Sequence, residues 1–144
     1  IEARYEIEVE EYVHILQIEG RSLGDIARNH VIPTAVKYQN ILIDNVKGLK
    51  DIFGKDFKKY ASEQLVLIAD ISQRIEAINS GVTTMTNERK KANTISDTTK
   101  KATVYCNQVK PLFDDIRYHC DKLELLIDDE LWPLAKYREL LFTK

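Results

Sequence analysis

Apolar residues recur along this chain at alternating steps of three and four, the spacing that keeps them on one face of an α-helix. The first such stretch crosses Pro33 without losing its phase, so we predict one helix over residues 1–53, kinked at the proline. Gly54 follows, and glycine readily adopts the left-handed conformation in which many helices end. Near its start, this helix places four side chains on one face: Tyr5, Val9, Tyr12 and Leu16.

Two further stretches predict helices over residues 57–92 and 97–130. Asp56 and Ser96 precede them, and side-chain oxygens at such positions accept the free N–H groups of a first helical turn. Pro111 lies inside the third helix, where it must kink the helix or leave a carbonyl for a neighbour to satisfy. We therefore predict an all-α fold, an antiparallel bundle of three long helices in one domain.

Residues 131–144 form a short tail after the third helix, and its large apolar side chains include Trp132, Tyr137 and Phe142. A side chain of this kind forgoes about 1.5–3 kcal/mol when it stays in water. We therefore predict that the tail packs back on the bundle, and we count these three residues among the candidate interaction residues.

The first helix is apolar on two sides near its start, because Ile7 and Ile18 lie nearly opposite the face that carries Tyr5. The first helix has a predicted length of about 75 Å, whereas the second has a predicted length of about 50 Å. A second helix that folds back from the turn therefore reaches only to about Ile18, and the seam from Tyr5 to Leu16 overhangs the bundle. We predict that residues 1–18, the arm, contact another protein body. In the isolated chain we predict self-association through the arm as a two-fold dimer.

The composition is typical of a helical domain of ordinary size. The 144 residues are 44% hydrophobic and 31% charged, with only 5 Gly and 3 Pro. Basic residues number 21 and acidic residues 23, and they are interleaved, so no broad positive field is available for a nucleic acid. No apolar run approaches the roughly 18 residues of a membrane span. We expect a cytoplasmic protein with no membrane partner. Because the chain begins at Ile1 and its only methionine is Met85, we interpret it as a piece of a longer protein.

Candidate catalytic groups are sparse. Glu11 and His14 form a Glu-x-x-His step, but a di-metal helical bundle needs that step twice with further carboxylates, so we predict no metal site. Cys106 and Cys120 lie on one predicted helix, separated by a rise of about 21 Å. They cannot pair with each other, because a disulfide needs Cα atoms within about 7 Å.

Basic residues flank the turn between the second and third helices, at Arg89–Lys91 and Lys100–Lys101. Together they could hold a phosphate, but cations at the end of a helix more often offset its dipole. The sequence contains no glycine-rich phosphate loop and no assignable Ser/His/Asp or Cys/His arrangement. We therefore predict no catalytic, cofactor-binding or metal-binding residue in this chain.

Several segments, in their order and spacing, resemble the helical C-terminal region of type III glutamine synthetases. They are Arg4–Ile7, Gln17–Glu19, Ile32–Tyr38, Val109–Leu112 and Leu131–Phe142. The first three are similar to the start of that region and the last is similar to its end. Gly20 and Gly24 depart from the pattern, because the family usually carries better helix formers there.

The resemblance implies a parent enzyme, a glutamate–ammonia ligase, that makes glutamine from glutamate, ammonia and ATP with Mg²⁺ or Mn²⁺ in large stacked-ring oligomers. Its catalytic residues would lie upstream, and none corresponds to a position in this chain. ATP and the metal would therefore bind in the catalytic body of the parent, which becomes the expected partner of the arm.

Our leading hypothesis is a non-catalytic C-terminal helical domain that supports assembly or regulation of the parent ligase. The alternative is a free-standing coiled-coil interaction module, and the sequence upstream of Ile1 separates the two. A carboxylate-bridged di-metal enzyme ranks third, and metal analysis of the purified protein would test it. The sequence leaves open whether the domain is regulatory or only architectural, and whether it binds a small effector.

Overall fold

The computed structural model describes residues 2–128 and 130–132, and every regular element in those ranges is helical. The all-α class is therefore confirmed. The elements are α1 (Glu2–Ile26), η1 (Ala27–Val31), α2 (Ile32–Phe53), η2 (Gly54–Asp56), α3 (Phe57–Asn93), α4 (Thr98–Val104), η3 (Tyr105–Val109) and α5 (Lys110–Leu126).

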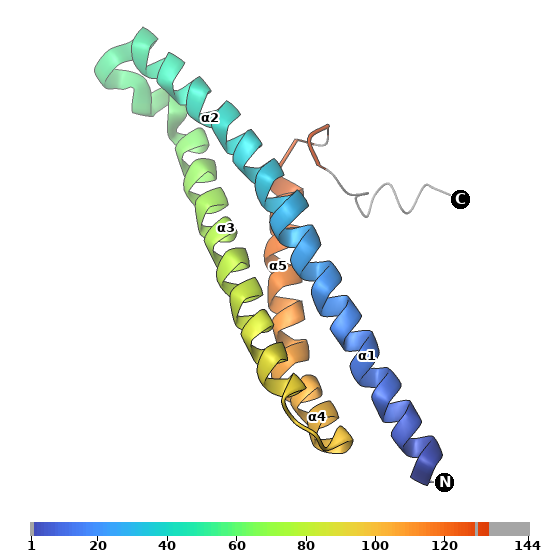
Figure 1. Cartoon of the computed structure of the whole chain (residues 1–144). Coiled ribbons are helices and arrows are strands. Elements are labelled where there is room, and N and C mark those ends of the chain that lie inside the picture. The colour runs from blue at the N-terminus through green and yellow to red at the C-terminus, as the bar shows by residue number, and fades with distance from the viewer. Residues whose placement is uncertain (1, 129, 133–144) are drawn as a thin grey trace.

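Figure 1 shows α1 and α2 as one long rod, with the N-terminus at one end and a hairpin tip at the other. The chain turns at η2, and α3 runs back along α2. A second turn leads into α4, η3 and α5, which return along α3 and pack against α1. Because α5 ends well short of the η2 turn, the tip of the α2–α3 hairpin extends beyond it (Figure 1).

Three long helices were predicted, the first kinked at Pro33, but a five-residue π-helical turn divides both the first and the third. Each turn comes just before a proline, η1 before Pro33 and η3 before Pro111. A proline has no N–H, and its ring clashes with the carbonyl four residues earlier. In a π turn each hydrogen bond spans five residues instead of four, and the wider turn moves that carbonyl away from the proline ring. The helical rod of α1 and α2 therefore continues past Pro33, because η1 accommodates the proline.

Side chains and backbone groups satisfy the polar atoms around the π turns. The N–H of Ile32 donates to the carbonyl of Ala27, and the N–H of Lys110 donates to that of Tyr105. The buried hydroxyl of Thr34 donates to the carbonyl of His30 at 2.8 Å. Since buried polar groups need partners, this bond satisfies the Thr34 hydroxyl beside Pro33.

Two of the expected helix caps differ in the structure. Asp97, rather than Ser96, caps α4, and its carboxylate accepts a hydrogen bond from the N–H of Lys100 at 3.0 Å. Asp56 makes no capping bond, because it lies in the η2 turn, where its carboxylate is 3.8 Å from the ammonium of Lys59. Gly54 has a positive φ of 56°, as expected, but its ψ of −123° lies outside the left-handed helical region.

The third segment also ends earlier than expected. Its last helical residue is Leu126, and Ile127 is extended, with φ −86° and ψ 145°. The expected boundary at residue 130 is therefore four residues too late. Residues 131–144 were expected to form a packed tail, and of these only Leu131 and Trp132 are described, the rest lying outside the described part of the chain.

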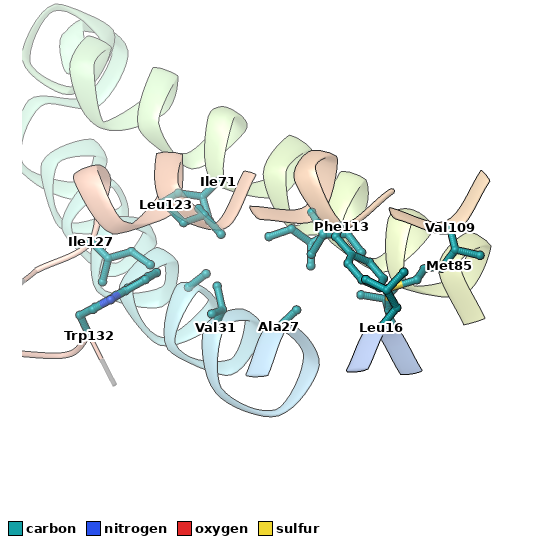
Figure 2. Close-up of a cluster of buried hydrophobic side chains, with 14 of the residues drawn as sticks. Leu16, Ala27, Val31, Ile71, Met85, Val109, Phe113, Leu123, Ile127 and Trp132 are labelled. Carbon is teal, nitrogen blue, oxygen red and sulfur yellow. The ribbon is translucent and has the colours of Figure 1, made fainter. Parts of the chain in front are cut away.

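The core lies where three helical segments run side by side: α1–α2, α3 and α4–α5. Figure 2 shows side chains from all three meeting there. Nine large side chains are almost wholly buried: Tyr105, Phe113, Ile71, Ile78, Met85, Ile116, Leu123, Val31 and Val109. Burial of each stabilises the fold by about 1.5–3 kcal/mol relative to exposure. Ala27, Ala35, Ala61 and Ala92 are fully buried as well, which places small side chains where helices approach closely.

Candidate functional site

Metal-ligating residues do not gather in the described part of the chain, which contains no group of three or more His, Cys, Asp or Glu side chains able to hold an ion. Glu11 and His14 of the Glu-x-x-His step are both exposed on α1. His30 is also exposed, with its Nε2 at 4.0 Å from a carboxylate oxygen of Asp25. These side chains have the geometry of surface residues.

His119 on α5 links to α3 instead of facing a cavity. Nη1 of Arg74 lies 3.1 Å from Nδ1 of the imidazole, and Asp70 accepts a hydrogen bond from Nε of Arg74 at 3.3 Å. A guanidinium can only donate, so Nδ1 accepts and the ring proton lies on Nε2, which faces Asp115 at 3.8 Å. The acceptor nitrogen is already used, and this histidine is not placed to act as a general base.

The two cysteines occupy different environments, and both are free thiols. Burial raises the pKa of Cys120 to about 11, with a smaller contribution from the negative charge of Asp121. Its thiol is therefore protonated at neutral pH and is a poor nucleophile. Cys106 is exposed and lies beside Tyr12, whose pKa is raised by the hydrogen bond between the two side chains and by burial.

The arm is only partly covered. Tyr5, Ile7 and Ile18 are 50–57% exposed, whereas Val9 and Tyr12 are half-buried. Leu16 is only 3% exposed, because α4 and α5 pack against α1 beyond the end of α3. The expected overhang from Tyr5 to Leu16 is therefore too long, and Leu16 belongs to the core of this chain.

Sequence reasoning missed a third member of the exposed arm surface. Ile15 is 55% exposed. At 100° per residue, Ile15 lies about 80° around the helix from Ile7, and Ile18 lies about 20° from Ile7 on the same side. Ile7, Ile15 and Ile18 form one apolar stripe, called here the arm stripe, on the side of α1 opposite the half-buried face. In the sequence, Ile15 lies directly beside Leu16, whose side chain belongs to the buried face.

Among the predicted interaction residues of the tail, only Trp132 is described, and unlike the arm it is buried. Trp132 is 9% exposed and packs with Ile127 at one end of the core (Figure 2). Tyr137 and Phe142 lie outside the described residues. Trp132 is thus part of the core and is not available to a partner.

The hairpin tip carries a second exposed apolar surface. The ring of Phe53 stacks on that of Tyr60, with centroids 4.0 Å apart, and both side chains are exposed. Ile52 and Val66 are 75% and 65% exposed. The sequence pattern alone does not mark these residues as exposed, and α5 ends short of the hairpin tip (Figure 1).

The basic residues around the α3–α4 turn do not assemble as one cluster. Lys91 pairs with Glu88 at 3.3 Å, and Lys101 lines a different hollow, beside His14. Arg89 instead joins Arg21 and Arg28 around a groove of about 310 Å³ between α1 and α3. Sequence reasoning missed this groove, because its arginines come from segments far apart in the chain.

In the described part of the chain, none of the helices combines the length and the apolar character that crossing a bilayer requires.

Comparison with known proteins decides the family. The family model for the glutamine synthetase C-terminal domain matches residues 1–50, which include the arm and Pro33. A glutamine synthetase of Bacteroides fragilis is 47% identical over 142 residues, covering 98% of this chain. The chain belongs to the glutamine synthetase family, as a C-terminal domain.

Two more distant glutamine synthetases align with nearly the whole chain. The type-3 glutamine synthetase of Dictyostelium discoideum is 26% identical and covers all of it, and a glutamine synthetase of Butyrivibrio fibrisolvens is 22% identical and covers 99%. The chain spans only 20% of the length of each of these three relatives. The resemblance inferred from the sequence is therefore confirmed at the level of the family and its C-terminal domain.

Proposed function

We propose that this chain is the non-catalytic C-terminal helical domain of a type III glutamine synthetase and that it supports assembly or regulation of that enzyme. The parent would form glutamine from glutamate, ammonia and ATP in the cytoplasm. ATP and Mg²⁺ or Mn²⁺ would bind in its catalytic body. In the same proposal the helices act as one antiparallel bundle that holds the arm in place.

The observation that carries this proposal is the arm stripe. Ile7, Ile15 and Ile18 are each at least half exposed on a helix whose other side packs against α4. Full burial of an exposed isoleucine contributes about 1.5–3 kcal/mol, and each of these side chains, 50–57% exposed, has about half of that still to gain. A row of three such side chains on one helix is typical of a surface that meets another protein.

The occupant proposed for the arm stripe in the parent is the catalytic body. The arm lies at the start of the chain, within the residues that the family model matches, and the matched relatives are five times longer than this chain. In the isolated chain, a second copy of the same stripe would cover it in a two-fold dimer.

The alternative is a free-standing coiled-coil module. The long relatives weigh against it, and the sequence upstream of Ile1 distinguishes the two. A catalytic region in the same reading frame supports the domain, whereas a stop codon or an unrelated reading frame supports the module.

Substitution of the arm stripe in the full-length ligase tests the proposal. Ile7→Asp with Ile18→Asp should dissociate the assembly or lower its activity, measured by sedimentation velocity and by glutamine formation. Leu125→Asp is the matched control, because that side chain is 78% exposed on α5, and it should change neither quantity. If the double variant assembles and turns over normally, the arm stripe is not the contact.

The chain alone should make no glutamine from glutamate, ammonia and ATP. Turnover by a preparation free of host synthetase would overturn the non-catalytic assignment.

A further inference from the structure

Arg89 has an unusual environment for a charged residue. Its Nε is buried and has no hydrogen-bond partner, and the side chain pairs with no acid among the described residues. A buried donor that lacks a partner is destabilising, and more so when the group is charged. Arg89 also lines the groove between α1 and α3.

Two glycines of α1 make room for this arrangement. A Cβ at Gly20 would come within 2.9 Å of Cδ of Arg89 and 3.2 Å of Cζ of Phe113, so the arginine crosses α1 closely at this glycine. A Cβ at Gly24 would meet Met85 and Val82 only at 3.6 Å, an ordinary contact. The packing therefore leaves less room for a side chain at position 20 than at position 24. The second glycine, which is unfavourable in a helix, leaves the groove open.

Arg28 is held at the rim of the same groove. It lies in η1, and its Nη2 donates to the carbonyl of Asn79 at 3.2 Å and to the hydroxyl of Thr83 at 2.6 Å. Among the described residues, both hydrogen bonds of this guanidinium use the same nitrogen. π turns within longer helices frequently occur at functional sites. This turn carries both Arg28 and Asn29 to the groove.

The charges around the groove do not cancel. Arg21, Arg28 and Arg89 line it together with one acid, Asp25. That carboxylate already accepts a hydrogen bond from Asn29 at 2.5 Å and lies 4.0 Å from His30. The groove therefore carries an excess of positive charge in a chain whose net charge is −2.

We propose that the groove between α1 and α3 is a binding site for a phosphate-type oxyanion, held by Arg21, Arg28 and Arg89. Guanidinium groups donate in a fixed planar fork that matches the oxygens of phosphate, and a tetrahedral dianion presents enough oxygens for several of them. A volume of about 310 Å³ suits a small anion rather than a polymer. The site is independent of the arm stripe and of the proposed assembly role.

Titration of the 144-residue chain with inorganic phosphate tests the proposal. Calorimetry and thermal unfolding are followed at constant ionic strength, with chloride as the balancing anion. Phosphate should bind at one site and raise the melting temperature. Arg89→Gln should weaken binding on the order of tenfold. Lys90→Gln is the matched control, because it removes the same charge from the adjacent exposed position, and it should leave the affinity unchanged.

Gly24→Ala separates binding from folding. The added methyl group fits the chain and favours the helix, so the variant should melt at or above the temperature of the wild-type protein without ligand. The same methyl group occupies the groove, so phosphate binding should be lost or strongly weakened. Circular dichroism of each variant verifies that its helix content is unchanged.

Other anions identify the source of the phosphate. Tighter binding of glycerol 3-phosphate than of inorganic phosphate supports a phosphorylated metabolite, and equal or weaker binding supports free phosphate. The proposal is overturned if phosphate has no effect, if Arg89→Gln binds phosphate as tightly as the wild type does, or if Lys90→Gln weakens binding as much as Arg89→Gln does. Succinate binding as tightly as phosphate would also overturn it, because the site would then be one for carboxylates.

Discussion

The hydroxyl of Tyr105 donates a hydrogen bond to Oδ1 of Asn93 at 2.5 Å, and this contact joins η3 to the end of α3. Nε2 of Gln17 donates to the same oxygen at 2.9 Å, so one amide oxygen links three segments at the end of the core. Tyr105 is fully buried. The bond therefore fixes the turn between α3 and α4 from inside the fold.

Tyr105→Phe should lower the free energy of unfolding by about 1–2 kcal/mol, because it removes a buried hydrogen bond and keeps the ring. Urea denaturation measures the change. Tyr118→Phe is the control, since that exposed ring lies 5.4 Å from the guanidinium of Arg74 and phenylalanine preserves this contact. Equal stability of the two variants would mean that the Tyr105 hydroxyl contributes nothing.

Gly81 and Ile116 should show coupled effects on stability. A Cβ at Gly81 would approach Cγ1 of Ile116 to 3.0 Å, so Gly81→Ala should cost about 1–3 kcal/mol by overpacking, despite the better helix propensity of alanine. Ile116→Ala should cost about 2–5 kcal/mol by leaving a cavity.

In the double variant, the new methyl group at position 81 meets the space left by the isoleucine. The cost of the two changes together should therefore be smaller than the sum of the single costs, as a double-mutant cycle would measure. Simple additivity would show that the two helices do not meet at this point.

The thiols should differ in their reaction with an alkylating reagent. Cys106 is exposed and should react quickly at pH 8. The pKa of Cys120 is about 11, so only a small fraction is thiolate at pH 8, and its rate should rise with pH until about pH 11. Mass spectrometry of partly labelled protein distinguishes the two sites. In urea both should react alike, and a difference that persists there would contradict burial as the cause.

The isolated chain should self-associate through the arm stripe. Sedimentation equilibrium should show a concentration-dependent dimer, which Ile7→Asp with Ile18→Asp weakens or abolishes. Ile52→Asp is the control for a general effect of added charge, since Ile52 is 75% exposed at the opposite end of the rod. A plain monomer at high concentration would contradict the prediction. Loss of association with Ile52→Asp alone would place the contact at the hairpin tip.

Periodicity predicted much of the fold, since it depends on which side chains share a face of a helix. It identified the long helical segments and the turns near Gly54 and residue 94. The π turns were not predicted, because the apolar pattern continues across Pro33 and Pro111. An extra residue in a turn becomes evident only when partners on neighbouring helices fix the register.

The candidate sites were predicted less well. Ile7 and Ile18 were found because the pattern places them on a second face of α1. Arg89 was interpreted as a charge at a helix end. In the structure its side chain lies against Gly20, which is far away in the sequence. No local pattern contains such a contact. The departure of Gly20 from the family pattern was the one visible signal, and it gained a meaning only when the helix facing it was known.

The unbroken course of the backbone from α1 through η1 into α2 has a mechanical consequence. The arm and the hairpin tip are opposite ends of one stiff lever, about 75 Å long at 1.5 Å per residue. A rotation of about 5° at the arm would displace the tip by about 6 Å over that length. A partner that binds the arm therefore also sets the position of the stacked rings of Phe53 and Tyr60. A small movement at one end of the chain is amplified into a large one at the other.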